Sequence, residues 1–369
     1  MSFEARYHSI FYLSIKIVKV LVGLSGGVDS SVSAFLLKQE GFEVTAGFMR
    51  NWEDDDGSPY CSVKEDFLDA AQVADKLGIN LVQMNFAQQY KEKVFSYFLD
   101  ELNNGKTPNP DIYCNKFIKF KEFTDYAIQN DFDAVATGHY SKVQVIDKEF
   151  FLCKSYDQNK DQTYFLSQVK KDVFKNIKFP LGNLLKTDVR KIAEAENLIT
   201  YDKKDSTGIC FIGERPFPEF LKNYLPEDYG EIVDENDEVI GEHKGLYFYT
   251  IGQRQGLGIG GMKNRAEKAW YVAQKDFSNN KLIVVQENDH PLLFKQKLSV
   301  SNINWLKQPS SSKVSAKIRY RQKDQDCEIN IHGNKAKVFF KEPQRAVTPG
   351  QFIVFYEDEI CLGGGEIDI

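Results

Sequence analysis

The sequence predicts an α/β domain with a doubly wound parallel sheet, followed by a small β-rich central domain and a C-terminal β-barrel. Between residues 17 and 140, continuous apolar runs alternate with amphipathic runs of helical period. This pattern is typical of parallel strands that are covered by helices on both faces. From residue 231 onward, short β-rich runs alternate with polar turn clusters, which indicates a small barrel or sandwich.

The α/β domain can be divided into its elements in chain order. We expect strands at residues 18–24, 42–48, 81–86 and 133–137. We expect helices at residues 30–40, 63–77, 91–102 and 115–129. Two of these helices end at Gly41 and Gly78, and glycine commonly terminates a helix. Helical signals continue to about Asn197, with Thr187 as the cap of a helix at 189–195.

The rest of the chain is predicted to form two β-rich domains. Turn clusters at residues 234–237 and 279–280 interrupt the first, and six or so short strands follow from Leu298 onward. We place the domain boundaries near residues 214 and 290. The expected divisions are an N-terminal extension at 1–16, the α/β domain at 17–214, the central domain at 215–290 and the barrel at 291–369.

Composition and charge narrow the class of protein. The chain has 369 residues, 42% of them apolar and 27% charged, which is typical of a soluble globular protein. No run approaches the ~18 apolar residues of a membrane helix, and residues 1–16 lack the features of a signal peptide, so we expect a cytoplasmic protein. The net charge of −6 excludes a uniformly basic surface, so any RNA would have to bind local basic patches.

A glycine loop, Ser25-Gly26-Gly27-Val28-Asp29-Ser30-Ser31, follows the first strand and opens a helix. Two glycines let backbone N–H groups approach phosphate oxygens, and the helix N-terminus adds favourable partial charge. Neither the Walker form nor the dinucleotide form G-x-G-x-x-G is present. The loop could instead be a plain glycine turn that Asp29 and Ser30 cap. Phosphate binding is favoured because the complete string lies at the carboxyl end of a parallel strand.

Six cysteines occur, and no two of them have the C-x-x-C spacing of zinc or redox sites. A disulfide framework is not expected in a chain of this length without a secretory signal. We expect four of the six to be small buried apolar residues. These four are Cys61, Cys153, Cys327 and Cys361.

Cys114 lies in an unusual setting, after Pro108 and Pro110 and at or next to a predicted helix start. A helix N-terminus lowers the pKa of a thiol and favours the reactive thiolate. The bland alternative is a buried cysteine that packs beneath the proline turn.

Cys210 has glycines on both sides, at Gly208 and Gly213, which is typical of a mobile loop able to carry a sulfur atom inward. The alternative is a short buried strand at residues 209–212 with Cys210 in the core. The residues alone do not decide between these two interpretations.

Six motifs carry a resemblance to a known family. They are Ser25–Ser31, Asn109–Phe120, Thr137–Tyr140, Asp161–Leu166, Asp205–Gly213 and Tyr249–Gly258. In this order, and from about residue 17 to the last residue, the chain resembles the bacterial tRNA-specific 2-thiouridylases. These enzymes belong to the ATP pyrophosphatase superfamily, whose fold is similar to that of the adenine nucleotide α-hydrolases.

The resemblance implies an enzyme that converts uridine 34 of tRNA to 2-thiouridine with ATP and a protein persulfide. ATP, normally with Mg²⁺, would adenylate the C2 oxygen of the base and leave as AMP and diphosphate. Cys210 would carry the persulfide and Cys114 would be its partner nucleophile. The sulfur could come directly from the persulfide, with a Cys114–Cys210 disulfide as product, or as released sulfide, and the sequence does not choose between these routes.

The resemblance also implies two sets of binding residues. ATP would contact Gly23, Leu24, Ser25, Gly26, Gly27, Val28, Asp29, Ser30, Met49 and Gly138. The tRNA would contact Asn109, Pro110, Asp111, His139, Lys160, Asp161, Gln162, Arg319, Tyr320 and Gln351. Asp111 would touch the target base or move a proton, although it could simply cap the following turn. Met49 could merely end its strand, and the charges at 317–323 could merely face water.

The resemblance also implies partners for this chain. The family implies tRNAs for Lys, Glu and Gln and a protein that relays persulfide sulfur. No residue is assigned to a metal, because the acidic run at 53–56 is more typical of a solvated loop.

Two other classes of function remain open, namely an amidotransferase-type synthetase of the same superfamily and a non-catalytic RNA- or nucleotide-binding protein. The synthetase would not need Cys114 and Cys210, and the binding protein would not convert ATP to AMP.

Overall fold

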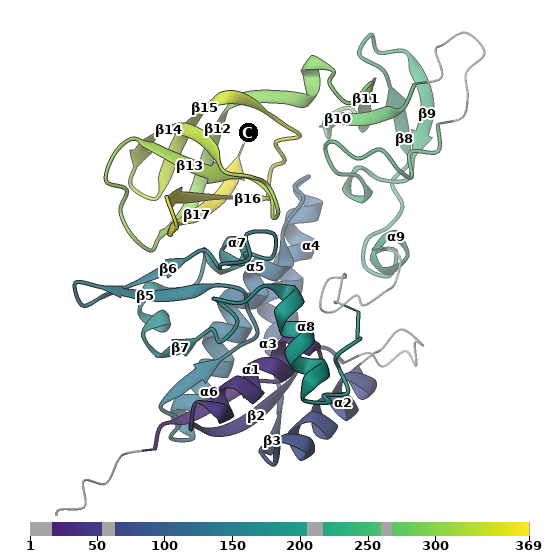
Figure 1. Ribbon diagram of the computed structural model, residues 1–369. Coiled ribbons are helices and arrows are strands. Elements are labelled where there is room, and N and C mark those ends of the chain that lie inside the picture. Colours follow the sequence, from purple (N-terminus) through teal and green to yellow (C-terminus); the bar gives the residue numbers. More distant parts are fainter. Residues whose placement is uncertain (1–16, 54–62, 205–216, 260–267, 369) are drawn as a thin grey trace, which may run out of the picture.

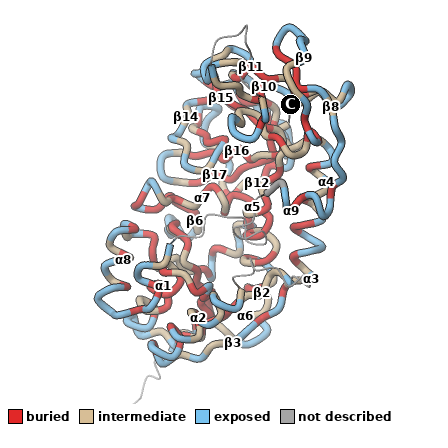
Figure 2. The backbone as a smooth tube through the Cα atoms, turned by 90° about the vertical axis from the view of Figure 1, so that its right-hand side faces the viewer, coloured by how far each residue is buried: buried red, intermediate tan, exposed pale blue. Residues whose placement is uncertain are grey.

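A computed structural model describes residues 17–53, 63–204, 217–259 and 268–368. Figure 1 shows an α/β domain at one end, the barrel at the other, and the β-rich central domain beside the barrel. Figure 2 shows that buried positions run through β16 and β17 of the barrel. No helix in the described ranges combines the length and the apolar character needed to cross a bilayer.

The α/β domain is built on a five-stranded parallel sheet with the strand order β3-β2-β1-β4-β7. Its strands are β1 (Lys19–Gly23), β2 (Glu43–Arg50), β3 (Asn80–Asn85), β4 (Ala134–Ala136) and β7 (Ile177–Lys178). Successive residues of a strand point to opposite faces, so Val20 and Val22 pack in one core and Leu21 in another. The predicted doubly wound parallel sheet is therefore confirmed.

Helices cover both faces of this sheet. On the face of Val20 lie α1 (Val28–Gln39), α2 (Val63–Leu77) and α8 (Lys186–Ala195). On the face of Leu21 lie α3 (Ala87–Tyr90), α4 (Ser96–Asn103), α5 (Pro110–Cys114), α6 (Phe123–Gln129) and α7 (Thr163–Leu166). Two π-helical segments, Lys91–Phe95 and Asn115–Glu122, join α3 to α4 and α5 to α6.

The prediction of continued helix up to residue 197 was wrong at residues 142–153. Here β5 (Lys142–Ile146) and β6 (Glu149–Cys153) form an antiparallel hairpin. Its two turn residues, Asp147 and Lys148, have φ values of 50° and 69°, the left-handed backbone of a tight hairpin turn. The missed signal was the alternation of polar and apolar residues along β5.

The predicted cap at Thr187 was also wrong. Helix α8 begins at Lys186, and the residue at its cap position is Leu185, two residues before Thr187. The Lys186 backbone N–H donates to the Asp157 carboxylate at 2.9 Å. A carboxylate from a distant loop therefore satisfies this helix end, which no local pattern reveals.

The central domain is a four-stranded mixed sheet with the order β10-β11-β8-β9. Its strands are β8 (Gly230–Val233), β9 (Val239–His243), β10 (Trp270–Asp276) and β11 (Lys281–Gln286). A short helix, α9 (Phe217–Leu221), precedes it and packs on the α/β domain through Phe220.

The C-terminal barrel has six antiparallel strands. They are β12 (Phe294–Trp305), β13 (Lys313–Lys317), β14 (Gln325–His332), β15 (Lys335–Arg345), β16 (Phe352–Glu357) and β17 (Ile360–Asp368). Pairing of β12 with both β15 and β17 closes the barrel. Strand β17 also pairs with β6, so the hairpin of the α/β domain extends the sheet of the barrel.

Candidate functional site

The glycine loop after β1 is rigidly preformed. Gly26 has φ +74°, and a Cβ atom there would overlap the carbonyl oxygen of Asp66 in α2. The Ser30 hydroxyl accepts from the Ser25 N–H at 3.1 Å and donates to the Gly27 carbonyl at 3.0 Å. Gly27 is the residue before α1, so the interpretation in which Asp29 and Ser30 cap the helix was wrong. The N–H groups of the first turn face the loop as they would for an anion.

Two lysines that the sequence did not single out lie at this loop. The Lys186 ammonium is 2.6 Å from the Asp29 carboxylate, which also accepts from the Tyr140 hydroxyl at 2.8 Å. The Lys203 ammonium donates to the Gly26 carbonyl at 3.0 Å and to Asp66 at 2.9 Å. Burial lowers the pKa of Lys203, but its pairing with carboxylates outweighs this and leaves that pKa raised. This pairing favours the charged form of Lys203, and both lysines lie beside the glycine loop.

Gly138 and Met49 adjoin the loop as the sequence predicted. A Cβ on Gly138 would lie 2.9 Å from the backbone of Asp29 and Ser30, so only glycine allows this approach. Met49 is the last residue but one of β2 and lies beside Gly23, where a Cβ would lie 3.3 Å from the Met49 methyl carbon.

Leu24 and Val28 have side chains in the hydrophobic core. They can therefore offer a ligand only their backbone.

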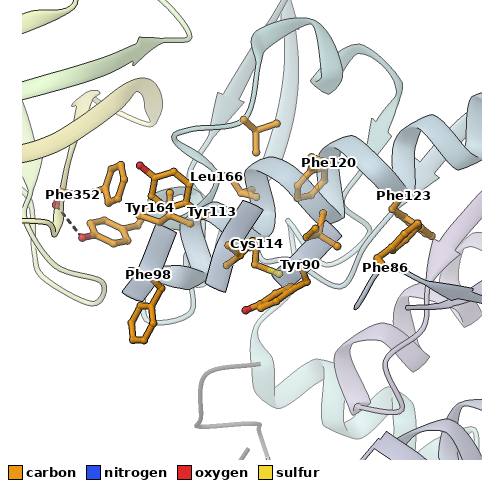
Figure 3. Packing of buried hydrophobic residues seen from close by; sticks show 14 of the residues in the cluster. Phe86, Tyr90, Phe98, Tyr113, Cys114, Phe120, Phe123, Tyr164, Leu166 and Phe352 are labelled. Carbon is orange, nitrogen blue, oxygen red and sulfur yellow. Dashed lines mark hydrogen bonds between the residues drawn. The ribbon is translucent and has the colours of Figure 1, made fainter. Parts of the chain in front are cut away.

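Cys114 is not at a helix start. Helix α5 begins at Pro110, and the Asn109 side chain accepts from the Ile112 N–H at 3.4 Å as its cap. Cys114 is the last residue of α5, beyond the first turn where the helix dipole acts. Its side chain is 1% exposed, as the alternative of a buried cysteine predicts. Figure 3 shows Cys114 beside Tyr90 in the aromatic core.

An aromatic chain of contacts connects the surroundings of Cys114 to α9. The Tyr90 ring packs edge-on against Trp52 at 6.3 Å, and Trp52 packs against Phe220 of α9 at 6.4 Å. Cys210, together with the alternative strand at 209–212, lies outside the described residues, as does Cys61. Phe220 and Leu221 of α9, which follow Cys210 in the chain, belong to the same hydrophobic cluster as Cys114.

The other described cysteines are buried, as expected. Burial raises the pKa of Cys153 to about 11, and it raises the pKa of Cys327 and of Cys361 to about 12. These three side chains are thiols at neutral pH and have no role as nucleophiles in our account.

Burial and the charge of Lys119 both act on the ionisation of Asp111 and of His139. Burial raises the pKa of the Asp111 carboxyl, and the charge of Lys119 opposes that rise. Burial lowers the pKa of His139 well below its usual value, and Lys119 lowers it further. Because Asn109 is the cap of α5, the interpretation of Asp111 as a capping residue was wrong.

His139 is enclosed rather than exposed. Its Nδ1 atom is 2.8 Å from the Thr137 hydroxyl, and its ring lies between Phe120 and Phe179 at 5.6 and 6.2 Å. The ring is part of the packed interior beside Phe120 and Phe179, and an RNA could touch it only after some rearrangement.

Two predicted RNA contacts have internal partners. The buried Asp161 carboxylate accepts from the Ser155 N–H at 3.2 Å and from the Thr163 hydroxyl at 2.7 Å. The Gln162 amide oxygen accepts from the Tyr140 N–H at 2.9 Å. These bonds hold the segment against the glycine-loop side of the domain.

Lys160, Arg319 and Tyr320 do meet on one surface between the α/β domain and the barrel. The Tyr320 hydroxyl donates to the Lys160 carbonyl at 3.5 Å, and its ring packs on Phe165 at 4.5 Å. Arg319 is exposed, and the Arg321 guanidinium lies 5.5 Å from the Tyr320 ring. Two arginines and an aromatic ring make this the kind of surface that binds nucleic acid. The predicted contact Gln351 instead donates to the Thr107 carbonyl at 2.7 Å.

Among the described residues, no three His, Cys, Asp or Glu side chains converge to hold a metal ion. Mg²⁺ that accompanies a nucleotide takes most of its ligands from phosphate and water. Asp29 is the carboxylate of the loop, and it is paired with Lys186 at 2.6 Å.

Family models cover the three domains. A tRNA methyl transferase HUP domain matches residues 18–214, a tRNA methyl transferase PRC-barrel domain matches residues 218–286, and an aminomethyltransferase beta-barrel domain matches residues 295–367. The tRNA-specific 2-thiouridylase MnmA of Francisella tularensis subsp. novicida is 54% identical over 354 residues, which are 95% of this chain and 99% of that protein. The protein of the same description from Francisella philomiragia is similar to the same extent.

Proposed function

The chain belongs to the family of tRNA-specific 2-thiouridylases, and from this membership we propose that it uses ATP to replace the C2 oxygen of uridine 34 in tRNA with sulfur. The observation that carries the proposal is the 54% identity over 95% of the chain. The preformed phosphate loop supports the use of ATP. A tRNA substrate also implies that the enzyme works in the cytoplasm.

The glycine loop is the proposed site of the ATP phosphates. The backbone N–H groups of Gly26 to Ser30 would hold diphosphate oxygens, and the charges of Lys186 and Lys203 would balance the phosphate charge. Mg²⁺ bound by Asp29 would neutralise further phosphate charge. A C2 carbonyl of uridine is a poor electrophile, and transfer of AMP to its oxygen makes that oxygen a leaving group.

The sulfur then reaches C2 by displacement. The terminal sulfur of a Cys210 persulfide would attack C2, the C2–O bond would break, and AMP would leave with that oxygen. The Cys114 thiolate would next attack the Cys210 sulfur, which breaks the S–S bond and leaves 2-thiouridine and a Cys114–Cys210 disulfide. In the second route, Cys114 attacks the persulfide first and releases sulfide, which attacks C2. Both routes end in a Cys114–Cys210 disulfide, which an external thiol must reduce before the next turnover.

The burial of Cys114 imposes a condition on this chemistry. A sulfur that is 1% exposed cannot reach a base or a second sulfur until its cover moves. The contact between α9 and the aromatic residues around Cys114 is the packing of Phe220 on Trp52 and on Phe95. We propose that the contact loosens when the anticodon base enters, which requires the base to leave its stack.

Asp111 is the proposed contact for the base. Burial raises the pKa of its carboxyl, so it holds a proton more readily than a surface aspartate and can donate it to the activated oxygen. Lys160, Arg319 and Tyr320 would contact the anticodon arm. We propose tRNAs for Lys, Glu and Gln as substrates and a persulfide-relay protein as the sulfur donor.

The test is mass spectrometry of tRNA nucleosides after incubation with unmodified tRNA, ATP and a sulfide source. We expect 2-thiouridine with the native enzyme and none with Cys114→Ala or Cys210→Ala. Cys327→Ala, a change at another buried cysteine, is the matched control and should keep activity. A synthetase of the same superfamily would form no 2-thiouridine and would keep its ATP-to-AMP turnover in both single variants. An absence of tRNA-dependent AMP formation would favour a binding protein.

A further inference from the structure

The three domains meet at the short segment that joins α4 to α5. A Cβ on Gly105 would overlap the ring of Phe277 from the central domain. A Cβ on Gly350, in a turn of the barrel, would lie 2.7 Å from the Lys106 Cβ and 3.0 Å from the Thr107 nitrogen. Both glycines have positive φ, so the close approach requires glycine at each point.

Hydrogen bonds to the N–H and to the carbonyl of Thr107 fix this segment to the barrel, and the second of them comes from the Gln351 side chain. The Thr107 N–H donates to the Pro349 carbonyl at 2.8 Å, and the Thr107 carbonyl accepts from the Gln351 amide at 2.7 Å. The same residue is therefore held on both sides by one turn. Only Pro108 and Asn109 separate it from the start of α5.

A partly buried ion-pair network adds contacts at the same junction. The Lys106 ammonium lies 2.7 Å from the Glu366 carboxylate of β17 and 2.6 Å from Glu101 of α4. Glu366 is 2% exposed and also accepts from the Tyr97 hydroxyl at 3.1 Å. The Tyr97 ring packs at 4.1 Å on Tyr113, the neighbour of Cys114. The network thus contacts α5 from a second direction.

We propose that Lys106 and Gln351 are positioning residues for the thiolation reaction. They hold the start of α5 against the barrel and so set where Asp111 and Cys114 stand relative to the base. This inference rests on the proposed function. The fixed φ of Pro108 and the rigidity of a helix pass a shift at Thr107 on to α5. Catalysis is sensitive to such shifts, since a misplacement of ~1 Å can cost about 100-fold in rate.

The test compares Gln351→Ala and Lys106→Met with the native enzyme in sulfur transfer to tRNA. We expect kcat to fall about tenfold or more, while the KM for tRNA and for ATP stays within about twofold, because positioning acts on the reacting groups rather than on binding. Lys106→Arg, which keeps the charge, should restore most of kcat. Lys307→Met is the matched control, because it removes another ion pair of the barrel, 2.8 Å from Glu357, away from the segment.

The kinetic pattern separates the possible results. A higher KM for tRNA with unchanged kcat in Gln351→Ala would overturn the inference and assign that amide to RNA binding. An equal loss in Lys307→Met would overturn it too, since a general weakening of the barrel would then explain the effect. If Lys106→Met fails to fold, Gln351→Ala decides alone, because it removes only a neutral hydrogen bond. Failure of the native enzyme to form 2-thiouridine would instead refute the proposed function, on which this inference depends.

Discussion

The phosphate loop and the thiol region differ in how ready they are for chemistry. The loop is shaped by its own hydrogen bonds, and Gly26 approaches the carbonyl of Asp66 so closely that no side chain fits there. Cys114, by contrast, is enclosed by aromatic side chains. ATP is abundant and can bind a preformed site at any time, whereas a reactive sulfur is oxidised if it stays exposed. An enclosed thiol and a preformed nucleotide loop in one domain therefore suit a reaction in which sulfur moves last.

Gly26→Ala should disrupt the phosphate loop. The new methyl group meets a backbone carbonyl and requires a strained φ, so the loop must shift by ~1 Å and AMP formation should fall about 100-fold. Gly41→Ala is the control, because Gly41 has φ +86° with nothing within 4 Å of the new atom. Rates of AMP release with tRNA measure both. Equal losses in the two variants would contradict a specific role for the loop.

Lys186→Met should weaken nucleotide binding at the same loop. The change removes the charged partner of Asp29 at 2.6 Å, and a charged hydrogen bond contributes about 1.5–3 kcal/mol, so the KM for ATP should rise about tenfold or more. Lys191→Met, which removes the surface pair with Asp188 on the same helix, is the control. An unchanged KM in Lys186→Met would show that this lysine only supports the fold.

Phe220→Ala should open the thiol region and leave the loop unaffected. Loss of the packing on Trp52 makes local opening easier, so alkylation of Cys114 should speed up by about tenfold for each 1.4 kcal/mol lost. The labelled peptide can be followed by mass spectrometry, and the KM for ATP should not change. Phe339→Ala, at a half-exposed position on β15, is the control. An unchanged labelling rate would show that Phe220 does not limit access to Cys114.

A smaller effect is expected on the free energy of unfolding at acid pH. Burial lowers the pKa of His139, so below about pH 6.5 the unfolded chain binds a proton that the folded chain does not. The free energy of unfolding should therefore fall as pH falls, by up to about 1.4 kcal/mol per pH unit from this residue. Chemical denaturation of His139→Asn should show a flatter pH dependence than the native protein. His332→Asn, an exposed change on β14, should leave the native slope.

The sequence predicted the parts of the molecule that local patterns determine. Continuous apolar runs identified β1 to β4, and the predicted helix at 63–77 matches α2 in full. The glycine loop was placed correctly because its two adjacent glycines and the apolar strand before it can both be recognised in a short stretch of sequence. The six-stranded barrel followed from the spacing of turns in the same way.

Long-range partners account for the errors. The lysines at the loop, Lys186 and Lys203, stand 157 and 177 residues from their partners Asp29 and Gly26, so no local pattern marks them. The capping of α8 by Asp157 and the burial of Cys114 depend on tertiary contacts in the same way. The start of α5 is an exception, because Asn109 followed by Pro110 is a recognisable helix beginning that we overlooked.

The pairing of β6 with β17 has a consequence for synthesis on the ribosome. Lys154, next to β6, is buried and donates to the Asp358 carbonyl at 2.7 Å across 204 residues of chain. At about 5–20 residues per second, roughly 10–40 s pass between the appearance of this lysine and that of its acceptor. During that time the hairpin β5–β6 presents an unpaired edge. Chaperone binding to nascent chains should therefore concentrate on this hairpin.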